Sequence, residues 1–127
     1  IKGDNGDGHD HVKTALSKGA VAAIVHQNID DVDQNKLIRV NDTFIALQAL
    51  GHGARARCAA KIIGITGSVG KSGTKEMCGA ALAVFGQTHW STKSYNNHWG
   101  VPLSLSRMHA GCDYAVFEMG MNHHKEI

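Results

Sequence analysis

The chain has 127 residues, 43% of them apolar and 19% charged, which is typical of an ordinary globular domain rather than a disordered or fibrous chain. A formal net charge of +2, with basic residues scattered along the chain, argues against a partner such as nucleic acid or an acidic membrane. No apolar run approaches the roughly 20 residues of a membrane-spanning helix, and the start at Ile1 does not have the pattern of a signal peptide. Because the chain also lacks an initiator Met, we expect it to begin inside a longer one.

The elements expected in the first part of the chain are a turn at 3–8, a helix at 11–18, a strand at 20–25, a polar loop at 28–36, a strand at 37–40 and a helix from 43 toward 58. Asp10 is expected to cap the first helix and Gly19 to end it. Asn41 or Asp42 is expected to cap the second. His9, just before the first helix, is expected in a solvated loop.

At residue 61 the pattern changes, and we expect a strand at 61–66, a helix at 71–85, a short strand at 88–90, a turn at 94–98, a helix at 101–108 and a strand at 114–117. Strands that alternate with helices predict an α/β fold with a parallel sheet. We expect a boundary near 58–61 between two α/β pieces, residues 1–58 and 59–127, each too short to be a complete domain.

The three cysteines are odd in number and widely spaced, and they contain no C-x-x-C pair. We therefore expect Cys58, Cys78 and Cys112 to be reduced thiols, buried or half-buried, in a cytoplasmic protein. The nine histidines occur singly or in chance pairs, without an H-E-x-x-H pattern or a cluster with cysteine.

A glycine-rich loop lies between the strand and the helix that follow residue 61. In such a loop the backbone N–H groups can surround phosphate oxygens, and the helix N-terminus adds its positive end. Lys71 would reach the β- and γ-phosphates, and the Ser72 hydroxyl would ligate magnesium. The full G-x-x-x-x-G-K-[ST] pattern needs glycine at position 65, where this chain has Ile65, so a tight turn with an exposed lysine is the alternative. The candidate phosphate-binding residues are Gly67, Ser68, Val69, Gly70, Lys71, Ser72 and Gly73.

Glu118 follows the last predicted strand at its carboxyl end, where parallel α/β sheets place their ligands. Its carboxylate could hold magnesium beside Ser72, and a solvated acid at a strand end is the alternative. Asn96 and Asn97 could belong to a site or form a turn. His123 could likewise be a loop histidine in water.

Taken together, these segments resemble one family. Ile65–Ser72 is similar to the short phosphate loop of the Mur ligases, which lacks the first glycine of the Walker pattern. The segments Ser94–Pro102 and Phe117–His123 resemble the branch of this family that adds a dipeptide, although members often carry asparagine where Ser94 stands. Several short segments before residue 23, including Asp7–Asp10, resemble the end of the family's N-terminal substrate domain.

The resemblance implies an ATP-dependent ligase of bacterial cell-wall synthesis, acting in the cytoplasm as a monomer at full length. Its cofactors would be ATP and Mg²⁺, and its substrates UDP-N-acetylmuramoyl-tripeptide and D-alanyl-D-alanine, joined through an acyl phosphate. Residues 1–58 would then be the end of the UDP-substrate domain, and 59–127 the first part of the central ATP-binding domain. The uridine-binding segment, a modified lysine near a second magnesium and the C-terminal domain would lie outside residues 1–127.

The resemblance also implies roles for single residues. Lys71, Asn97 and His123 would act in catalysis, while Ser72 and Glu118 would hold magnesium. Asn96 and Asn122 would belong to the surrounding shell.

Several alternatives share the phosphate loop. A sister ligase that adds one amino acid, or a folylpolyglutamate synthetase, would carry it as well. From another class, a P-loop kinase or ATPase would share Lys71 and Ser72. The chain by itself could also be an inactive nucleotide-binding fragment.

Overall fold

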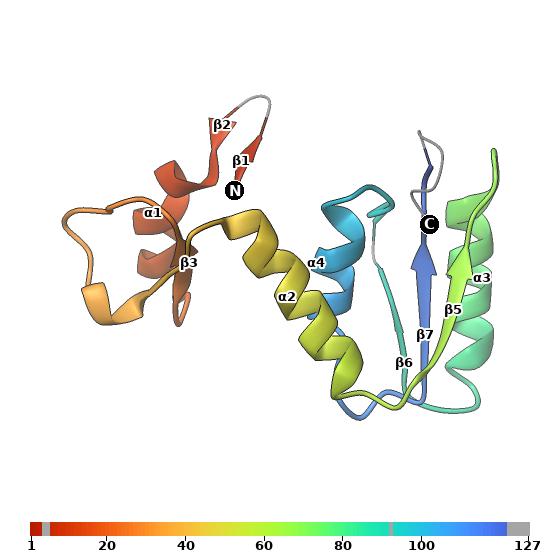
Figure 1. The fold of residues 1–127 in the computed structure, drawn as a ribbon. Coiled ribbons are helices and arrows are strands. Elements are labelled where there is room, and N and C mark those ends of the chain that lie inside the picture. The colour runs from red at the N-terminus through yellow and green to blue at the C-terminus, as the bar shows by residue number, and fades with distance from the viewer. Residues whose placement is uncertain (4–5, 92, 122–127) are drawn as a thin grey trace. The chain divides into compact units, whose positions relative to one another are not determined.

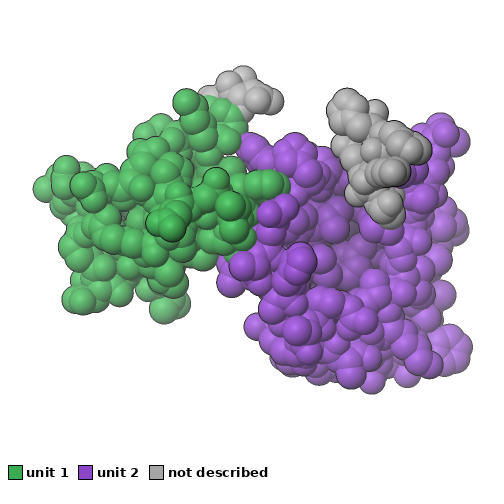
Figure 2. Space-filling model, in the orientation of Figure 1, with its two compact units in different colours: residues 1–46 green, residues 47–127 purple. Residues whose placement is uncertain are grey.

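The computed structural model describes residues 1–3, 6–91 and 93–121, and the chain divides into two compact units, 1–46 and 47–127 (Figures 1 and 2). The division falls within helix α2 (Thr43–Ala56), and each unit is described here by itself. Both units mix helices with parallel strand pairs, as the sequence predicted. The domain boundary near 58–61 stays a prediction. In the described part of the chain, no helix has the length and apolar character needed to span a bilayer.

Unit 1 is a small α/β arrangement. A short antiparallel pair comes first, and a parallel pair joins residues 23–25 to residues 37–39. Its elements are β1 (Lys2–Gly3), β2 (Gly6–Asp7), the 3-10 helix η1 (Gly8–His11), α1 (Val12–Ser17), β3 (Ala23–Val25), the 3-10 helix η2 (Gln34–Lys36) and β4 (Leu37–Arg39). Gly19 has a φ of 97° just after α1, which confirms that a glycine ends this helix.

The first helical turn is capped by Asp7 and not by Asp10, so the predicted cap is wrong. Asp7 Oδ1 accepts a hydrogen bond from the His9 backbone N–H at 3.0 Å and lies 2.5 Å from His9 Nδ1. The helix begins earlier than expected, as a 3-10 turn at Gly8, and its cap therefore moves upstream.

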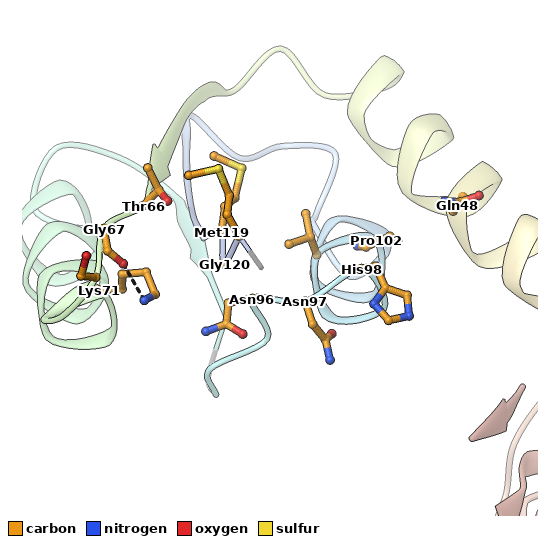
Figure 3. A pocket seen from close by; sticks show the side chains of 13 residues that line it. Gln48, Thr66, Gly67, Lys71, Asn96, Asn97, His98, Pro102, Met119 and Gly120 are labelled. Carbon is orange, nitrogen blue, oxygen red and sulfur yellow. Dashed lines mark hydrogen bonds between the residues drawn. The ribbon is translucent and has the colours of Figure 1, made fainter. Parts of the chain in front are cut away.

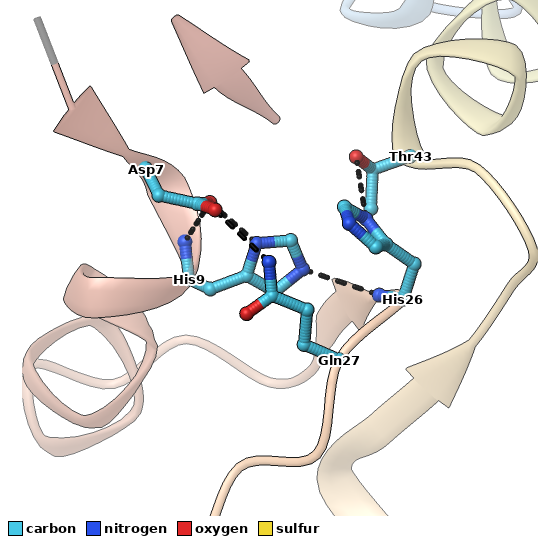
Figure 4. A network of polar contacts seen from close by, with 5 residues as sticks. All are labelled: Asp7, His9, His26, Gln27 and Thr43. Atoms are coloured by element: carbon cyan, nitrogen blue, oxygen red, sulfur yellow. Dashed lines mark hydrogen bonds and ion pairs between the residues drawn. The ribbon is translucent and has the colours of Figure 1, made fainter.

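His9 is buried, with 6% of its surface exposed, which corrects the expectation of a solvated loop histidine. Figure 4 shows its polar contacts. Because Nδ1 faces the Asp7 carboxylate, we assign the proton to Nδ1, and Nε2 then accepts from the His26 backbone N–H at 3.2 Å. Gln27 Nε2 donates to the second Asp7 oxygen at 3.0 Å. The imidazole thus joins the start of η1 to the end of β3, and both of its nitrogens form hydrogen bonds that stabilise this part of the fold.

Helix α2 begins after Asp42, whose Oδ1 accepts from the backbone N–H groups of Phe44 at 2.6 Å and Ile45 at 2.9 Å. Of the two predicted caps, Asp42 is therefore the one that the structure uses. Gly51 permits a close approach, because a Cβ built there would lie 3.2 Å from the Pro102 carbonyl oxygen. The glycine that weakens the helix in isolation thus allows α2 to pack against the segment that contains Pro102.

Unit 2 contains a three-stranded parallel sheet in the order β5 (Lys61–Ile65), β7 (Tyr114–Glu118), β6 (Thr88–Trp90). The chain moves two places along the sheet through α3 (Lys71–Leu82) and returns one place through α4 (Gly100–Ser106). Since parallel crossovers are right-handed, opposite directions of travel put the two helices on opposite faces, as Figure 1 shows.

The central strand β7 carries the core of this unit. Ala115, Val116 and Phe117 are all at most 4% exposed. The core cluster consists of Cys58, Ala60, Met108, Cys112, Ala115 and Phe117. All three cysteines are free, two buried and Cys78 half-buried, as predicted. Burial raises the pKa of the Cys112 thiol, which keeps it in the neutral form.

Candidate nucleotide and metal site

The candidate site lies at the carboxyl ends of β5 and β7. The register pairs Ile65 with Glu118, the last residue of each strand. The Met119 backbone N–H donates to the Ile65 carbonyl oxygen at 2.8 Å, so the two strands stay paired up to their carboxyl ends. The phosphate-loop candidate and the predicted magnesium carboxylate are therefore neighbours, as expected for a ligand site of a parallel sheet.

The loop between β5 and α3 has the backbone conformation that its glycines allow. Gly67 has a φ of 145° and Gly70 a φ of 78°, both in the region that side chains with a Cβ rarely adopt. Gly70 is the N-cap of α3, and within the described chain no side chain caps this helix. The first N–H groups of a helix have no intrahelical acceptor, so they and the positive end of the helix dipole face the loop. This arrangement fits a phosphate group.

Lys71 directs its ammonium toward the same loop. Its Nζ donates to the Gly67 carbonyl oxygen at 2.7 Å, and both residues line the pocket shown in Figure 3. The alternative was a tight turn with an exposed lysine, whereas this side chain folds back to the loop and is half-buried. The cation is thus held at the mouth of the uncapped helix.

Ser72 and Glu118 meet at the other side of the helix start. The Ser72 hydroxyl donates to Glu118 Oε2 at 2.9 Å, and Asn96 Nδ2 donates to Glu118 Oε1 at 2.8 Å. Ser94 Oγ lies 3.0 Å from Ser72 Oγ, and it is the donor there if the single proton of Ser72 goes to Glu118. Glu118 is only 2% exposed, so the alternative of a solvated strand-end acid is wrong.

A hydroxyl and a buried carboxylate form the kind of hard oxygen donor set that Mg²⁺ takes. In the described part of the chain, no group of three or more His, Cys, Asp or Glu side chains could hold a metal ion by itself. The fit is therefore to a magnesium ion that takes its remaining ligands from phosphate oxygens and water, as it does at nucleotide sites. The roles of Ser72 and Glu118 in metal binding stay predictions.

The two neighbouring asparagines have different partners. The Asn96 side chain contacts Glu118, and its carbonyl oxygen accepts from the Gly120 backbone N–H at 2.7 Å. Asn97 Oδ1 accepts from the backbone N–H groups of Trp99 at 3.2 Å and Gly100 at 2.7 Å, and so forms the turn into α4. The catalytic role of Asn97 stays a prediction. Asn122 and His123 lie outside the described residues.

A pocket of about 770 Å³ opens beside these groups (Figure 3). It is lined by Gln48, Thr66, Gly67, Ser68, Lys71, Asn96, Asn97, His98, Val101, Pro102, Met119, Gly120 and Met121. The phosphate loop, the asparagine pair and the start of α4 form its wall, together with Gln48 from α2. The volume is in the range of small-molecule sites, which are commonly about 300–1,000 Å³.

Sequence reasoning missed several residues of this region. Gln48 reaches the pocket only because α2 packs against α4, and a helix-packing contact leaves no local motif. Ser94 was noted only as a departure from the resembling segment, although it contacts Ser72. Its place after a short strand and before an asparagine pair was the available signal.

Comparison with known proteins agrees with the geometry. The sequence pattern of the Mur ligase middle domain matches residues 65–126. The UDP-N-acetylmuramoyl-tripeptide–D-alanyl-D-alanine ligase of Rickettsia prowazekii (strain Madrid E) is 42% identical over 123 residues, which is 97% of this chain and 27% of that protein. The ligase of the same name from Escherichia coli (strain K12) is 39% identical over 127 residues, covering 100% of this chain and 28% of that protein.

Solved structures show the same likeness. A crystal structure of MurF from Acinetobacter baumannii has a TM-score of 0.83 at 37% identity, over 99% of this chain and 27% of that one. MurF from Thermotoga maritima in complex with ADP has a TM-score of 0.74 at 29% identity, over 94% and 28% of the two chains. The chain thus spans roughly a quarter of the length of these relatives, and it matches them in sequence and in backbone. The chain belongs to the Mur ligase family.

Proposed function

We propose that this chain is part of an ATP-dependent ligase that joins D-alanyl-D-alanine to UDP-N-acetylmuramoyl-tripeptide in bacterial peptidoglycan synthesis. The single observation that carries the proposal is the meeting of the Ser72 hydroxyl and the Glu118 carboxylate, at 2.9 Å, beside the uncapped start of α3. Relatives that carry this name are 42% and 39% identical to nearly all of this chain. We place the full-length protein in the cytoplasm, as a monomer.

The chain's own residues would bind and orient the nucleotide. The backbone N–H groups from Gly67 to Gly73 hold the phosphates, and the Lys71 ammonium neutralises the γ-phosphoryl group as charge develops on it. Ser72 and Glu118 would hold magnesium, which would supply neutralisation of phosphate charge when bound. In support, a Mur ligase structure of similar backbone was solved with ADP.

The substrate chemistry follows the family. The γ-phosphoryl group of ATP passes to the carboxylate of the UDP-linked tripeptide, and the amine of D-alanyl-D-alanine then displaces phosphate from the acyl phosphate. Such catalysis consists mainly of positioning and charge neutralisation. Asn97 and Pro102 line the same pocket as Lys71, and the wall that they share offers a surface for the acceptor carboxylate. We assign Asn97 and His123 to this positioning task.

The test is phosphate release by the full-length protein, with each substrate omitted in turn. We expect release only when ATP, Mg²⁺, the UDP-linked tripeptide and D-alanyl-D-alanine are all present. Release that ignored the dipeptide and responded to a single amino acid would move the assignment to a sister ligase or a folylpolyglutamate synthetase. Release without either substrate would indicate a P-loop ATPase.

A further inference from the structure

A buried lysine lies one helical turn beyond the phosphate loop and has no part in the site described so far. Lys75 is only 1% exposed, although lysine is almost never fully buried unless its charge is paired. Its Nζ lies 3.0 Å from Glu76 Oε1 and donates to the Lys93 carbonyl oxygen at 3.3 Å. On helix α3, position 75 lies on the same face as Lys71 and Ser72, four and three residues earlier.

The partners of Lys75 connect α3 to β6. Glu76 Oε2 accepts from the Trp90 indole N–H at 2.9 Å. The Lys75 ammonium, and after it this indole, hold the pKa of Glu76 below its usual range. Gly79 allows the Trp90 ring to pack directly on the helix, because a Cβ built there would lie 2.6 Å from the ring. The helix thus contacts the strand closely through one glycine and a linked set of polar groups.

The segment at residues 93–96, which follows β6, lies between these contacts and the candidate metal site. Lys93 precedes Ser94, whose hydroxyl lies 3.0 Å from Ser72 Oγ. Two residues later, Asn96 donates to Glu118 at 2.8 Å. The 93–96 segment therefore has one hydrogen bond to the buried ammonium at its start and two contacts with the magnesium candidates after it.

We propose that Lys75 is a positioning residue of this site: its buried ammonium fixes the 93–96 segment on α3, and thereby sets how Ser94 and Asn96 meet Ser72 and Glu118. Partners that orient metal ligands are commonly worth about 10–100-fold in metal affinity. A carbonyl acceptor suits this task because it fixes the backbone, whatever side chain residue 93 carries. The proposal rests on the proposed function of the same site.

The test is a calorimetric titration of the full-length protein with ADP, with and without Mg²⁺. Lys75→Met keeps the length of the side chain and removes the charge. Glu76 is more than half exposed, so water can solvate its carboxylate and we expect the variant to fold. We expect the Mg²⁺-dependent part of the ADP affinity to fall by about tenfold or more. The affinity without Mg²⁺ should stay within about twofold, because Lys71 and its loop are intact.

Lys61→Met is the matched control, since it removes an exposed lysine at the amino end of β5, opposite the site. It should bind ADP as the unaltered protein does. Glu76→Gln is a second variant that changes an exposed side chain and keeps an acceptor for Trp90. It should lower the Mg²⁺-dependent affinity in the same direction as Lys75→Met.

A double-mutant cycle separates positioning from a general effect on folding. If Lys75 acts through the 93–96 segment, Lys75→Met should lower the Mg²⁺-dependent ADP affinity much less in the Asn96→Ala background than in the unaltered protein. Additive effects, or an unchanged Mg²⁺ dependence in Lys75→Met and Glu76→Gln, would overturn the positioning role alone. An unaltered protein whose ADP binding ignores Mg²⁺ would overturn both this inference and the proposed function.

Discussion

At the scale of single residues, the site is built from side chains whose polar atoms already have partners. Both carboxylate oxygens of Glu118 accept hydrogen bonds, and the Lys71 ammonium donates to a loop carbonyl. A buried carboxylate is tolerated because its lone pairs are bonded, and partners of this kind also hold it in one orientation. Side chains that are oriented before a ligand arrives lose little freedom on binding, which is what a catalytic site requires.

Lys71→Ala should abolish measurable turnover of the full-length ligase. The Lys71 ammonium lies where it can neutralise charge on the transferred group, and losing such a contact commonly costs about 3 kcal/mol or more, which is roughly a hundredfold or greater loss in rate. Steady-state phosphate release measures it, with Lys61→Ala as a control at the far end of β5. Near-normal turnover in Lys71→Ala would make the loop a purely structural turn.

Glu118→Gln should raise the magnesium concentration needed for half-maximal turnover. The change keeps the size of the side chain, and an amide is a weaker ligand than a carboxylate for a hard cation. A magnesium titration of activity measures the shift, and circular dichroism checks that the protein is folded. An unchanged titration in a folded variant would return Glu118 to a structural role as acceptor for Ser72 and Asn96.

At the scale of elements, unit 1 depends on polar side chains that satisfy backbone N–H groups at its helix starts. Asp42 does this for α2, and Asp7 does it for η1. The start of α3 differs because its N-cap is Gly70, which offers no side-chain acceptor. A glycine at the N-cap costs only about a few tenths of a kcal/mol compared with a capping side chain, and it leaves the first N–H groups for a ligand.

The Asp7 contacts predict how stability changes with acid. The His9 backbone N–H, then the His9 ring, with Gln27 as a lesser donor, hold the pKa of Asp7 well below its usual range. A depressed folded-state pKa adds stability above the unfolded pKa of about 4, and this stability is lost as the pH falls toward the folded value. Asp7→Asn should therefore show a flatter fall of the thermal midpoint between about pH 5 and pH 3.

The measurement is the thermal midpoint by circular dichroism across that pH range. Asp10→Asn is the matched control, because its carboxylate is exposed three residues away. Parallel acid profiles for Asp7→Asn and the unaltered protein would show that the His9 contacts do not contribute to acid sensitivity.

At the scale of the whole molecule, the chain matches roughly a quarter of the length of its relatives. Its described residues include the candidate phosphate loop and Glu118, the carboxylate predicted to hold magnesium. Ligation through an acyl phosphate needs three ligands held within near-attack distance, roughly 3–3.5 Å between reacting atoms. The pocket at the carboxyl ends of the strands supplies only part of that enclosure.

We therefore predict that residues 1–127 alone have no ligase activity, while the full-length protein does. Product formation from the UDP-linked tripeptide and D-alanyl-D-alanine, followed by chromatography at equal molar concentrations, makes the comparison. Ligated product from residues 1–127 at a rate near that of the full-length protein would show that this part contains the complete site.

The sequence by itself determined the type of most elements and predicted where a phosphate loop would lie. Apolar runs of strand length, helical spacing and glycine turns are local patterns, and they predicted β5, α3 and β7 to within a few residues. The candidate loop was predicted for the same reason, because a phosphate-binding loop needs glycines and a lysine at fixed spacing along one short segment. Glu118 was predicted as a magnesium ligand because the carboxyl end of a parallel strand is itself a local position, and that role stays a prediction.

Only the tertiary structure decided which of these groups meet. The hydrogen bond from Ser72 to Glu118 joins residues 46 positions apart, and it depends on β7 lying beside β5. The burial of Lys75 depends likewise on β6 and the segment after it covering one face of α3. Strand order and helix packing depend on many weak contacts between apolar side chains that are buried together. No short run of residues therefore encodes them.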